Sequence, residues 1–561
     1  MLTTMADVHD SDELALFEER AEYLTDSQFD AWTAPAPHET QVLRQLMSTG
    51  PKLLSGPRGC GKTTLMKRAQ RNMRIAGRSL PIYVNYGRSM FIEPAFTVRA
   101  DADGFFLDWL VAKVIVGLMS ELEEQGLSDV VSEYADVAQT FVNAAESDAS
   151  IQRAKLPGPN RLAAHLDELA LAAGFSQTVL LLDDAAHAFV PEQQRIFFEF
   201  VRNLKTQRVT YKAAIYPGVT EFSPNFHVGH DAKMIRAWIP VEGYEYLEFM
   251  RSAYQRRLPA AQRETVPNEV VDFFAGASFG IPRTFFSMLE MYLDQRTETS
   301  GKKARLPLQV VETHADQLRA VHRGLKVKLP RYERYVEAGE TVLGNGIRAI
   351  KDLNERRRDG APTALDLAIE TPASSQLGTV IGLLEYVGLV RSTAENVSVG
   401  DHSYSKYAVH GALLVSAAAL KFGQNPTLAD RGRALVRSAR TGSFARVVEG
   451  KLLPPAEASE CQLQVGRCPQ CRAERLHESA RFCHSCGSEL VEVSRLTELL
   501  AASIEELPLT EKKLAALREV DLTTVEAIVR DRGLAEISKA SRVGPTWARR
   551  IYSVAEEYVG V

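Results

Sequence analysis

The sequence has few cysteines, no long apolar run and almost no excess of one charge. Six cysteines in 561 residues exclude a small disulfide-stabilised scaffold. The most apolar run, 105–119, is interrupted by Asp108 and Lys113 and is too short to span a bilayer, so we expect a buried amphipathic helix there. Lysines and arginines total 66 against 71 aspartates and glutamates. Any contact with nucleic acid must therefore come from local basic patches.

A secretory signal is also missing, because the first residues, MLTTMADVHDSDELALF, are acidic and lack an apolar core. Four of the cysteines cluster at metal-ligand spacing, and Cys60 lies in a glycine-rich loop. Both settings need reduced sulfur, which predicts a cytoplasmic protein with no membrane contact. The apolar content of 45% and the charged content of 24% are typical of a soluble globular chain, and the length predicts roughly three to five domains.

The glycine-rich loop lies in 52–65, KLLSGPRGCGKTTL, and matches the pattern G-x-x-x-x-G-K-[ST] of a P-loop. A short apolar strand precedes the loop and a helix follows it, which is the context that this pattern requires. In such a loop the backbone N–H groups bind nucleotide phosphates, Lys62 reaches the β- and γ-phosphates, and the Thr63 hydroxyl binds Mg²⁺. The predicted nucleotide-binding residues are Gly56, Pro57, Arg58, Gly59, Cys60, Gly61, Lys62, Thr63 and Thr64.

A second motif, VLLLDD, ends at Asp183 and Asp184. Its continuous apolar run is typical of a strand buried on both faces of a parallel sheet. Beside the P-loop, Asp183 would hold the water shell of the Mg²⁺ bound by Thr63, and Asp184 would orient or deprotonate the attacking water. We therefore assign catalytic roles to Lys62, Asp183 and Asp184.

Further strands are expected at 79–87 and 209–218, with helices at 193–204 and from 266 onward. Such an alternation, followed by helices alone, predicts an α/β nucleotide-binding domain with a parallel sheet and a small α-helical lid. The lead-in segment before the P-loop has apolar positions at helical spacing. It either wraps the base of the nucleotide or only covers the sheet edge, and the sequence leaves both open.

The loop GPRGCGKT, the strand VLLLDD and the turn G-I-P-R at 280–283 resemble the AAA+ ATPases, and within them the initiator branch that recognises and remodels DNA at replication origins. The resemblance covers 40–318. It implies ATP and Mg²⁺ as ligands, and Arg283 as the lid arginine that contacts the γ-phosphate. It also implies a homo-oligomer in which Arg236 is the arginine finger, and a winged-helix domain after the lid.

Two departures from the family pattern concern hydrolysis. The strand end that presents a polar residue near the γ-phosphate in the family is IYPG here, with Tyr216 or Thr220 as substitutes. The second acid is Asp184 instead of glutamate, which is one methylene shorter and would set the water differently. The sequence therefore predicts an ATPase that is slow or stimulated by a partner.

The region 331–425 is predicted to be the winged helix. From Thr363, TALDLAIETPASSQLGTVIGLLEYVGLV favours helix, turn and helix, and a hairpin with its tip at 398–401 follows. The second helix carries almost no arginine or lysine, so contact with a DNA groove and packing against protein are equally favoured. In 426–460 the arginine spacing suits a helix with one basic face, which is either a solvated linker or a contact for phosphates.

Two Cys-x-x-Cys pairs lie within 461–492. They can place four thiolates at the corners of a tetrahedron, which is the geometry of a closed structural Zn²⁺ site. The short interval between the pairs fits a small zinc ribbon, and Cys461 is left over as a buried thiol. The predicted zinc ligands are Cys468, Cys471, Cys483 and Cys486.

The end of the chain, LAEISKASRVGPTWARRIYSVAEEY, resembles the helix-hairpin-helix family, whose tight turn points backbone N–H groups at a nucleic-acid phosphate. Val543 and Gly544 match the turn, while Ser541 stands where a first glycine is usual. Basic residues cluster around the turn, as sequence-independent contact with the backbone requires. Such modules also dock proteins. The predicted nucleic-acid residues are Lys539, Arg542, Val543, Gly544, Arg549 and Arg550.

These assignments divide the chain into a tail and lead-in helix (1–38), an AAA+ core (39–240), a helical lid (241–330), a winged helix (331–425), a basic linker (426–460), a zinc ribbon (461–492) and a helix-hairpin-helix domain (493–561). The first function that fits is an ATP-dependent switch or loader that engages DNA and controls a partner protein in replication, transposition, repair or anti-phage defence. A signalling NTPase that oligomerises on sensing a protein is the second. A nucleic-acid-binding scaffold that holds ATP structurally is the third.

Overall fold

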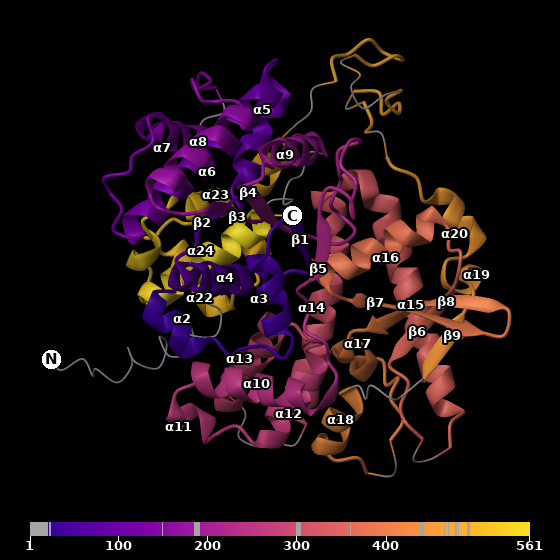
Figure 1. Ribbon diagram of the computed structural model, residues 1–561. Helices are drawn as coiled ribbons and strands as arrows, with labels where there is room; N and C mark the ends of the chain where they lie inside the picture. Colours follow the sequence, from indigo (N-terminus) through magenta and orange to yellow (C-terminus); the bar gives the residue numbers. More distant parts are fainter. Residues whose placement is uncertain are drawn as a thin grey trace.

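The computed structural model describes residues 21, 24–147, 150–184, 191–298, 305–358, 361–422, 425–436, 443–464, 466–468, 470–476, 480, 482–490 and 494–560. The first 20 residues of the predicted tail and lead-in helix lie outside these residues, as do Arg437 and Arg440 of the basic segment. Figure 1 shows an N-terminal half, coloured indigo and purple, beside a second half built from residues coloured magenta to orange. The C-terminal helices, coloured yellow, return to the first half.

The first half is built on a five-stranded parallel sheet with the strand order β2-β3-β4-β1-β5. Every residue of β4 is buried, and so are six consecutive residues of β3, which is why β3 contains a continuous apolar run at 179–182. The parallel sheet predicted from the sequence is present. Its strands are β1 (Lys52–Ser55), β2 (Ser79–Asn85), β3 (Gln177–Asp183), β4 (Val209–Ile215) and β5 (Lys233–Arg236).

Helices cover both faces of this sheet, because successive strand residues point to opposite sides. Leu54, Val179 and Leu181 pack under α3 (Glu39–Met47) and α4 (Lys62–Ala76). Leu180 and Leu182 face the other layer, formed by α6 (Ala102–Glu124), α8 (Pro159–Ala172) and α9 (Pro191–Leu204). The smaller helices of this half are α2 (Asp26–Trp32), α5 (Glu93–Val98), α7 (Ala135–Ala145) and a 3-10 turn, Ser89–Ile92.

The chain after β5 is helical in the segment predicted to be the lid. The Trp238 indole N–H donates to the Phe279 carbonyl oxygen at 2.7 Å and ties the end of the sheet to the lid. Gly280 has a φ of +76°, and a Cβ there would lie 2.1 Å from the Ile239 carbonyl oxygen. The turn that leads into the helix beginning at Pro282 therefore requires glycine. The helices are α10 (Gly243–Arg257), α11 (Ala260–Arg263), α12 (Asn268–Ala277) and α13 (Pro282–Glu298), and α14 (Leu306–Lys328) leads out of the lid.

A second sheet, with the order β7-β8-β6-β9, organises the region predicted to be a winged helix. The predicted hairpin is present as β7 (Val390–Val399) and β8 (His402–Val409). The first predicted helix is wrong: Asp366–Glu370 form strand β6, because this segment pairs with β8 on one side and with β9 (Phe444–Val447) on the other. Tertiary pairing here overrides the local helical pattern. The flanking helices are α15 (Glu333–Glu355), α16 (Ser375–Val387) and α17 (Gly411–Ser416).

The second predicted helix of this region, α16, is packed inside the chain. Its apolar residues Leu377, Val380, Ile381, Leu383 and Leu384 are buried, and it contacts α14, α15 and β7. The sequence left open whether this helix contacts a DNA groove or packs against protein, and in the structure it packs against protein. The helix therefore does not present a free face to a DNA groove along most of its length.

The basic segment is not the linker that we expected. Its residues form α18 (Leu428–Leu435), which packs on lid helix α12, followed by strand β9 and the short helices α19 (Glu449–Leu452) and α20 (Pro455–Glu460). Leu435, Ala445 and Leu452 belong to the same apolar core as the lid. The prediction was based on the arginine spacing and did not consider these apolar positions. The segment is part of the core of the second half.

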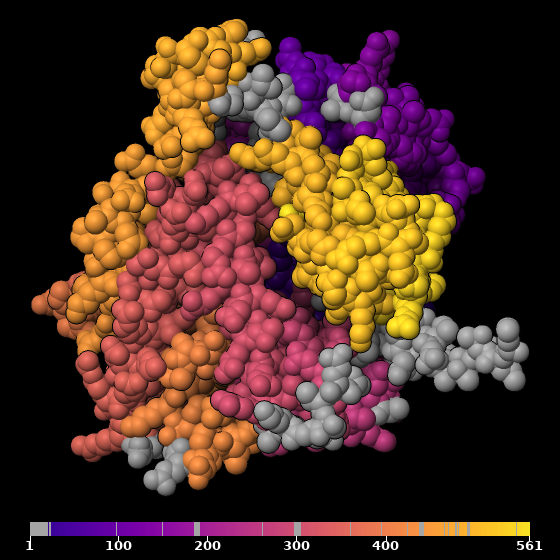
Figure 2. Space-filling view, turned by 180° about the vertical axis from the view of Figure 1, so that it is seen from behind, coloured from indigo at the N-terminus to yellow at the C-terminus, as the bar shows by residue number. Residues whose placement is uncertain are grey.

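The cysteine pairs lie in a small segment that stands apart from both halves (Figure 1). Beyond it, α21 (Arg495–Leu500), α22 (Glu511–Arg518), α23 (Val525–Arg530) and α24 (Pro545–Val559) form a C-terminal domain with its own apolar core. Figure 2 shows this yellow domain lying against the purple N-terminal half and the magenta lid. Within the described part of the chain, no helix is both long and apolar enough to cross a membrane.

Candidate nucleotide-binding site

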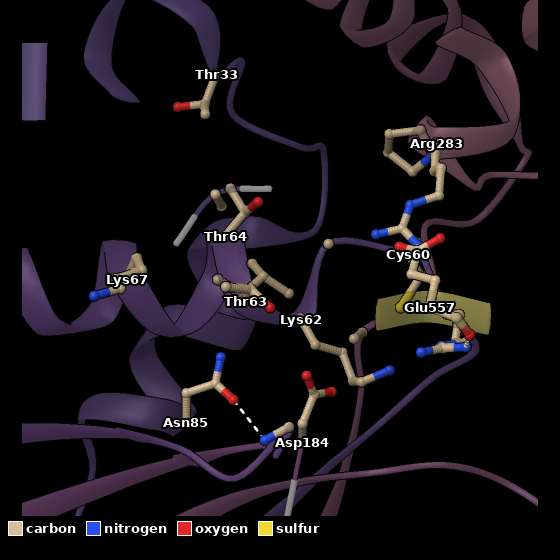
Figure 3. Close-up of a pocket in the computed structure, with 18 of the residues that line it drawn as sticks. Thr33, Cys60, Lys62, Thr63, Thr64, Lys67, Asn85, Asp184, Arg283 and Glu557 are labelled. Carbon is tan, nitrogen blue, oxygen red and sulfur yellow. Dashed lines mark hydrogen bonds and ion pairs between the residues drawn. The ribbon is translucent and has the colours of Figure 1, made fainter. Parts of the chain in front are cut away.

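The predicted P-loop connects β1 to α4 at the carboxyl edge of the sheet (Figure 3). Gly59 and Gly61 have φ values of +75° and +95°, so two left-handed residues turn the loop before Lys62 opens the helix. A Cβ on Gly59 would lie 2.7 Å from the Cβ of Arg283. Glycine therefore lets the lid come into direct contact with the loop.

Lys62 is held by the loop that carries it. Its side chain is buried, and its Nζ donates to the carbonyl oxygens of Gly56 at 2.7 Å and Pro57 at 3.0 Å. The ammonium also lies 3.8 Å from the ring centroid of Tyr216, a cation–π contact. Burial lowers the pKa of Lys62, and the nearby Cys60, Asp184 and Asp183 oppose that shift. Lys62 therefore contacts its own loop and the residue that follows β4.

The acid pair ends strand β3 directly beside α4. Asp183 is fully buried, and its carboxylate accepts hydrogen bonds from the Tyr83 hydroxyl at 2.9 Å, from the Asp184 backbone N–H at 3.0 Å and from the Thr63 hydroxyl. Burial, with a smaller contribution from Asp184, raises the pKa of Asp183 to about 6. The Thr63 hydroxyl oxygen and the Asp183 carboxylate oxygens lie next to each other. Oxygen ligands of this kind are the ones that Mg²⁺ prefers.

Asp184 adopts a φ of 49°, an uncommon left-handed conformation for a residue other than glycine. Its carboxylate accepts a hydrogen bond of 2.6 Å from the Tyr216 hydroxyl. Burial raises the pKa of Tyr216 well above its ordinary value, so the hydroxyl remains a donor at neutral pH. The backbone and the hydrogen bond together aim the second acid towards Lys62 (Figure 3).

Of the two substitutes for the polar strand end, the structure brings Tyr216 to the site. The Thr220 hydroxyl instead donates to the Tyr216 carbonyl oxygen at 2.7 Å and accepts from the Tyr216 backbone N–H at 3.2 Å. Thr220 therefore shapes the turn after β4, and Tyr216 faces the acid pair.

The two arginines that the resemblance singled out lie in different places. Arg283 begins α13 at the P-loop, and its guanidinium pairs with the Glu557 carboxylate at 2.7 Å. Arg236 is exposed and ends the edge strand β5, and its guanidinium donates to the Ser392 carbonyl oxygen at 3.1 Å. Only Arg283 belongs to the site.

A cavity of about 620 Å³ joins these groups. Its apolar part lies between the lead-in segment and the lid and is lined by Trp32, Ala34, Ile239, Phe249 and Phe286. Its polar part is lined by the P-loop, Lys67, Asn85 and Asp184. The lead-in segment borders the cavity at residues 32–38 and contacts the edge strand β5 through α3. It therefore covers the sheet edge, while its contact with a base stays a prediction.

The C-terminal domain also lines this cavity, through Arg532, Tyr552, Glu556 and Glu557. Sequence reasoning missed these four residues, because they lie more than 400 positions beyond the P-loop and carry no motif for nucleotide binding. Lys328 marks the same contact: it donates to the Gly560 carbonyl oxygen at 2.6 Å, and burial, followed by the charge of Arg58, lowers its pKa to about 7.

The four predicted zinc ligands lie together, with all four sulfur atoms within 4.8 Å of one another. The Sγ atoms of Cys468 and Cys486 are 3.6 Å apart, and those of Cys471 and Cys483 are 3.5 Å apart. Four sulfurs at ~2.3 Å from a Zn²⁺ ion would be ~3.8 Å apart, so the spacing fits tetrahedral zinc. Among its described residues, the segment buries few apolar side chains of its own. Cys461 lies apart from this group and is buried, as predicted.

The predicted nucleic-acid residues do not share one free surface. Lys539 pairs with Glu536 at 2.6 Å. Val543 is buried in the C-terminal core, and Gly544 precedes α24. The Arg542 carbonyl oxygen accepts from Lys513 at 2.6 Å, and Arg549 is half-buried on α24. Arg550 is mostly buried and forms a two-pronged ion pair with Glu290 of the lid.

Comparisons with known protein families and with curated proteins found no match. Among solved structures, the Orc1 protein of Aeropyrum pernix in complex with DNA is similar over 73% of this chain and 95% of that chain, with 15% identity and a TM-score of 0.31. Cdc6p from Pyrobaculum aerophilum is similar over 74% of this chain and 99% of that chain, with 14% identity and a TM-score of 0.31. At such low identity and TM-score, the function of this chain rests on the geometry of its own site.

Proposed function

We propose that this chain is an ATP-dependent switch of the AAA+ type that binds ATP with Mg²⁺ at the P-loop and controls a nucleic-acid-binding tail. The observation that carries the proposal is the convergence of three separate segments on one cavity. Lys62 of the P-loop, Asp184 of the acidic strand and Arg283 of the lid all line it. Each segment supplies a group that phosphoryl transfer from a nucleoside triphosphate needs.

The phosphates bind at the loop. Backbone N–H groups around Gly59 and Gly61 and the start of α4 face them, and Lys62 exchanges its two carbonyl contacts for phosphate oxygens. Thr63 and Asp183 hold Mg²⁺, which neutralises charge on the phosphates when it is bound. The apolar part of the cavity takes the base, and Arg283 takes the γ-phosphate.

Hydrolysis uses Asp184 to orient the attacking water, with the Tyr216 hydroxyl fixing that carboxylate. An aspartate reaches less far than a glutamate, so turnover is slow without a partner. If the pure protein binds ATP and never turns it over, even with nucleic acid, a scaffold that holds ATP structurally becomes the better description.

The positions of Arg236, the four cysteines and the C-terminal basic residues support the roles that we propose for them. Arg236 is exposed at the end of an edge strand, a place from which it can reach a neighbouring copy as an arginine finger. The four cysteines hold a structural Zn²⁺ ion that stabilises a segment with little core of its own. Lys539, Arg542 and Arg549 contact nucleic acid through its phosphates. The partner protein supplies any further chemistry.

The test is nucleotide binding by Lys62→Ala, measured by calorimetry with ATP and Mg²⁺. Losing one charged contact worth ~1.5–3 kcal/mol should weaken binding by about 10- to 150-fold. Lys205→Ala is the matched control. This lysine is exposed between α9 and β4, at the amino ends of the strands, whereas the P-loop lies at their carboxyl ends. Unchanged ATP binding in Lys62→Ala would contradict the site assignment.

A further inference from the structure

The C-terminal domain docks over the nucleotide site through contacts from several parts of the first half and the lid. Met90, which precedes α5, belongs to the apolar core of the C-terminal domain. Arg88 donates to the Tyr552 hydroxyl at 3.2 Å and lies 3.5 Å from the Glu556 carboxylate. Glu93 accepts hydrogen bonds from Ser494 and from the backbone N–H of Arg495. The domain is therefore seated by apolar packing, ion pairs and hydrogen bonds together.

One of these contacts engages a residue that the proposed function needs. The Glu557 carboxylate pairs with the Arg283 guanidinium at 2.7 Å, beside Cys60 of the P-loop (Figure 3). The Glu557 carbonyl oxygen accepts from Arg58 of the same loop at 3.4 Å. The last turn of α24 thus lies where the lid arginine would meet a γ-phosphate.

A second anchor lies outside the cavity. Arg550, two helical turns before Glu557, pairs with Glu290 on lid helix α13 through Nη1 and Nη2 of its guanidinium. Arg550 and Glu290 are both largely buried, and removing one partner of such a pair is costly because the other is left as an unpaired charge in the docked state. The same helix therefore holds the lid at Glu290 and the lid arginine at Arg283.

A γ-phosphate and Glu557 compete for Arg283. Both are anions that can pair with the Arg283 guanidinium. A triphosphate bound beside the Glu557 carboxylate also repels that carboxylate. A nucleoside diphosphate has no γ-phosphate and leaves the Arg283–Glu557 pair in place. The two nucleotides therefore differ in their affinity for the docked state, which is what a ligand must do to shift a conformational equilibrium.

We propose that α24 is a lock, supplied by the same chain, that keeps the C-terminal domain docked on the nucleotide site until the γ-phosphate of a nucleoside triphosphate takes Arg283 from Glu557. This proposal rests on the proposed function, since it needs a nucleotide at the P-loop. Release of α24 also frees Arg550 from Glu290 and exposes it for contact with nucleic acid. ATP and nucleic acid then strengthen each other's binding, because coupling between two sites is reciprocal.

The test compares four full-length proteins: wild type, Glu557→Gln, Arg550→Ala and the control Glu526→Gln. Glu526 pairs with Arg530 on the surface of the C-terminal domain, away from the docking contacts. Hydrogen exchange of residues 545–559 is measured with Mg²⁺ alone, with Mg²⁺ and the β,γ-imido analogue of ATP, and with Mg²⁺ and ADP. Calorimetry gives the affinity for the analogue and for ADP.

In the wild type and the control, the ATP analogue should speed exchange in α24 and ADP should not. Glu557→Gln and Arg550→Ala should speed exchange without nucleotide and bind the analogue about 5- to 20-fold more tightly, as expected if the docked state is the major one. ADP affinity should change by less than about 2-fold. Arg550 does not line the cavity, so a gain in Arg550→Ala reports undocking and not a local charge effect.

The two proposals fail in different ways. If neither nucleotide binds the wild type, both the proposed function and the lock are wrong. If both nucleotides bind but the analogue leaves exchange in α24 unchanged, the lock alone is wrong. The lock is also wrong if Arg550→Ala binds the analogue no more tightly than Glu526→Gln does.

Discussion

The hydrogen bond between Tyr216 and Asp184 gives the sharpest prediction about catalysis. The substitution Tyr216→Phe removes only the hydroxyl that donates to the Asp184 carboxylate at 2.6 Å. It keeps the ring that lies 3.8 Å from the Lys62 ammonium. A hydrogen bond to a charged group contributes ~1.5–3 kcal/mol. If that energy acts on the transition state, kcat should fall by about 10- to 150-fold, and KM for ATP should change by less than about 2-fold.

Tyr386→Phe is the matched control for this experiment. The Tyr386 ring packs edge-on against Tyr216 with 5.6 Å between centroids, and among the described residues its buried hydroxyl has no hydrogen-bond partner. Removing that hydroxyl should leave kcat close to wild type. The assay is steady-state phosphate release with saturating Mg²⁺. An unchanged or higher kcat in Tyr216→Phe, or an equal fall in Tyr386→Phe, would refute the role given to the Tyr216 hydroxyl.

Other predictions concern packing, pH and metal. Gly382→Ala should lower the thermal midpoint, because the new Cβ would lie 2.7 Å from backbone and overpacking costs ~1–3 kcal/mol; Gly378→Ala, in the same helix with open space around it, should match or exceed wild type. Burial, with a contribution from a neighbouring lysine, lowers the pKa of Lys212 to about 7. The unfolded chain therefore binds more protons between pH ~7 and ~10, and stability should rise there by at most ~1.4 kcal/mol per pH unit; calorimetric scans of Lys212→Met should show a flatter rise, and an unaltered rise would count against this account. Cys468→Ser should release about one equivalent of zinc per chain and Cys461→Ser none, measured by elemental analysis; retained zinc in Cys468→Ser would rule out the ribbon.

The close approach of two glycines explains where α16 packs. A Cβ on Gly218 would lie 2.0 Å from the carbonyl carbon of Gly382, so the helix backbone touches the turn that follows Tyr216. The pattern of apolar residues predicted a helix at this position, and the helix is there. Its neighbour could not be predicted, because the contact depends on two glycines more than 150 positions apart.

The sequence by itself determined the local parts of the site. The P-loop, the strand ending in Asp183 and Asp184, and the paired cysteines are short patterns in which neighbouring residues set both backbone and chemistry. Only the tertiary structure decided that 366–370 forms a strand, that Tyr216 and not Thr220 meets Asp184, and that α24 returns to Arg283. These features are contacts between distant segments. Their energy comes from pairing, burial and charge across the fold, which no local pattern records.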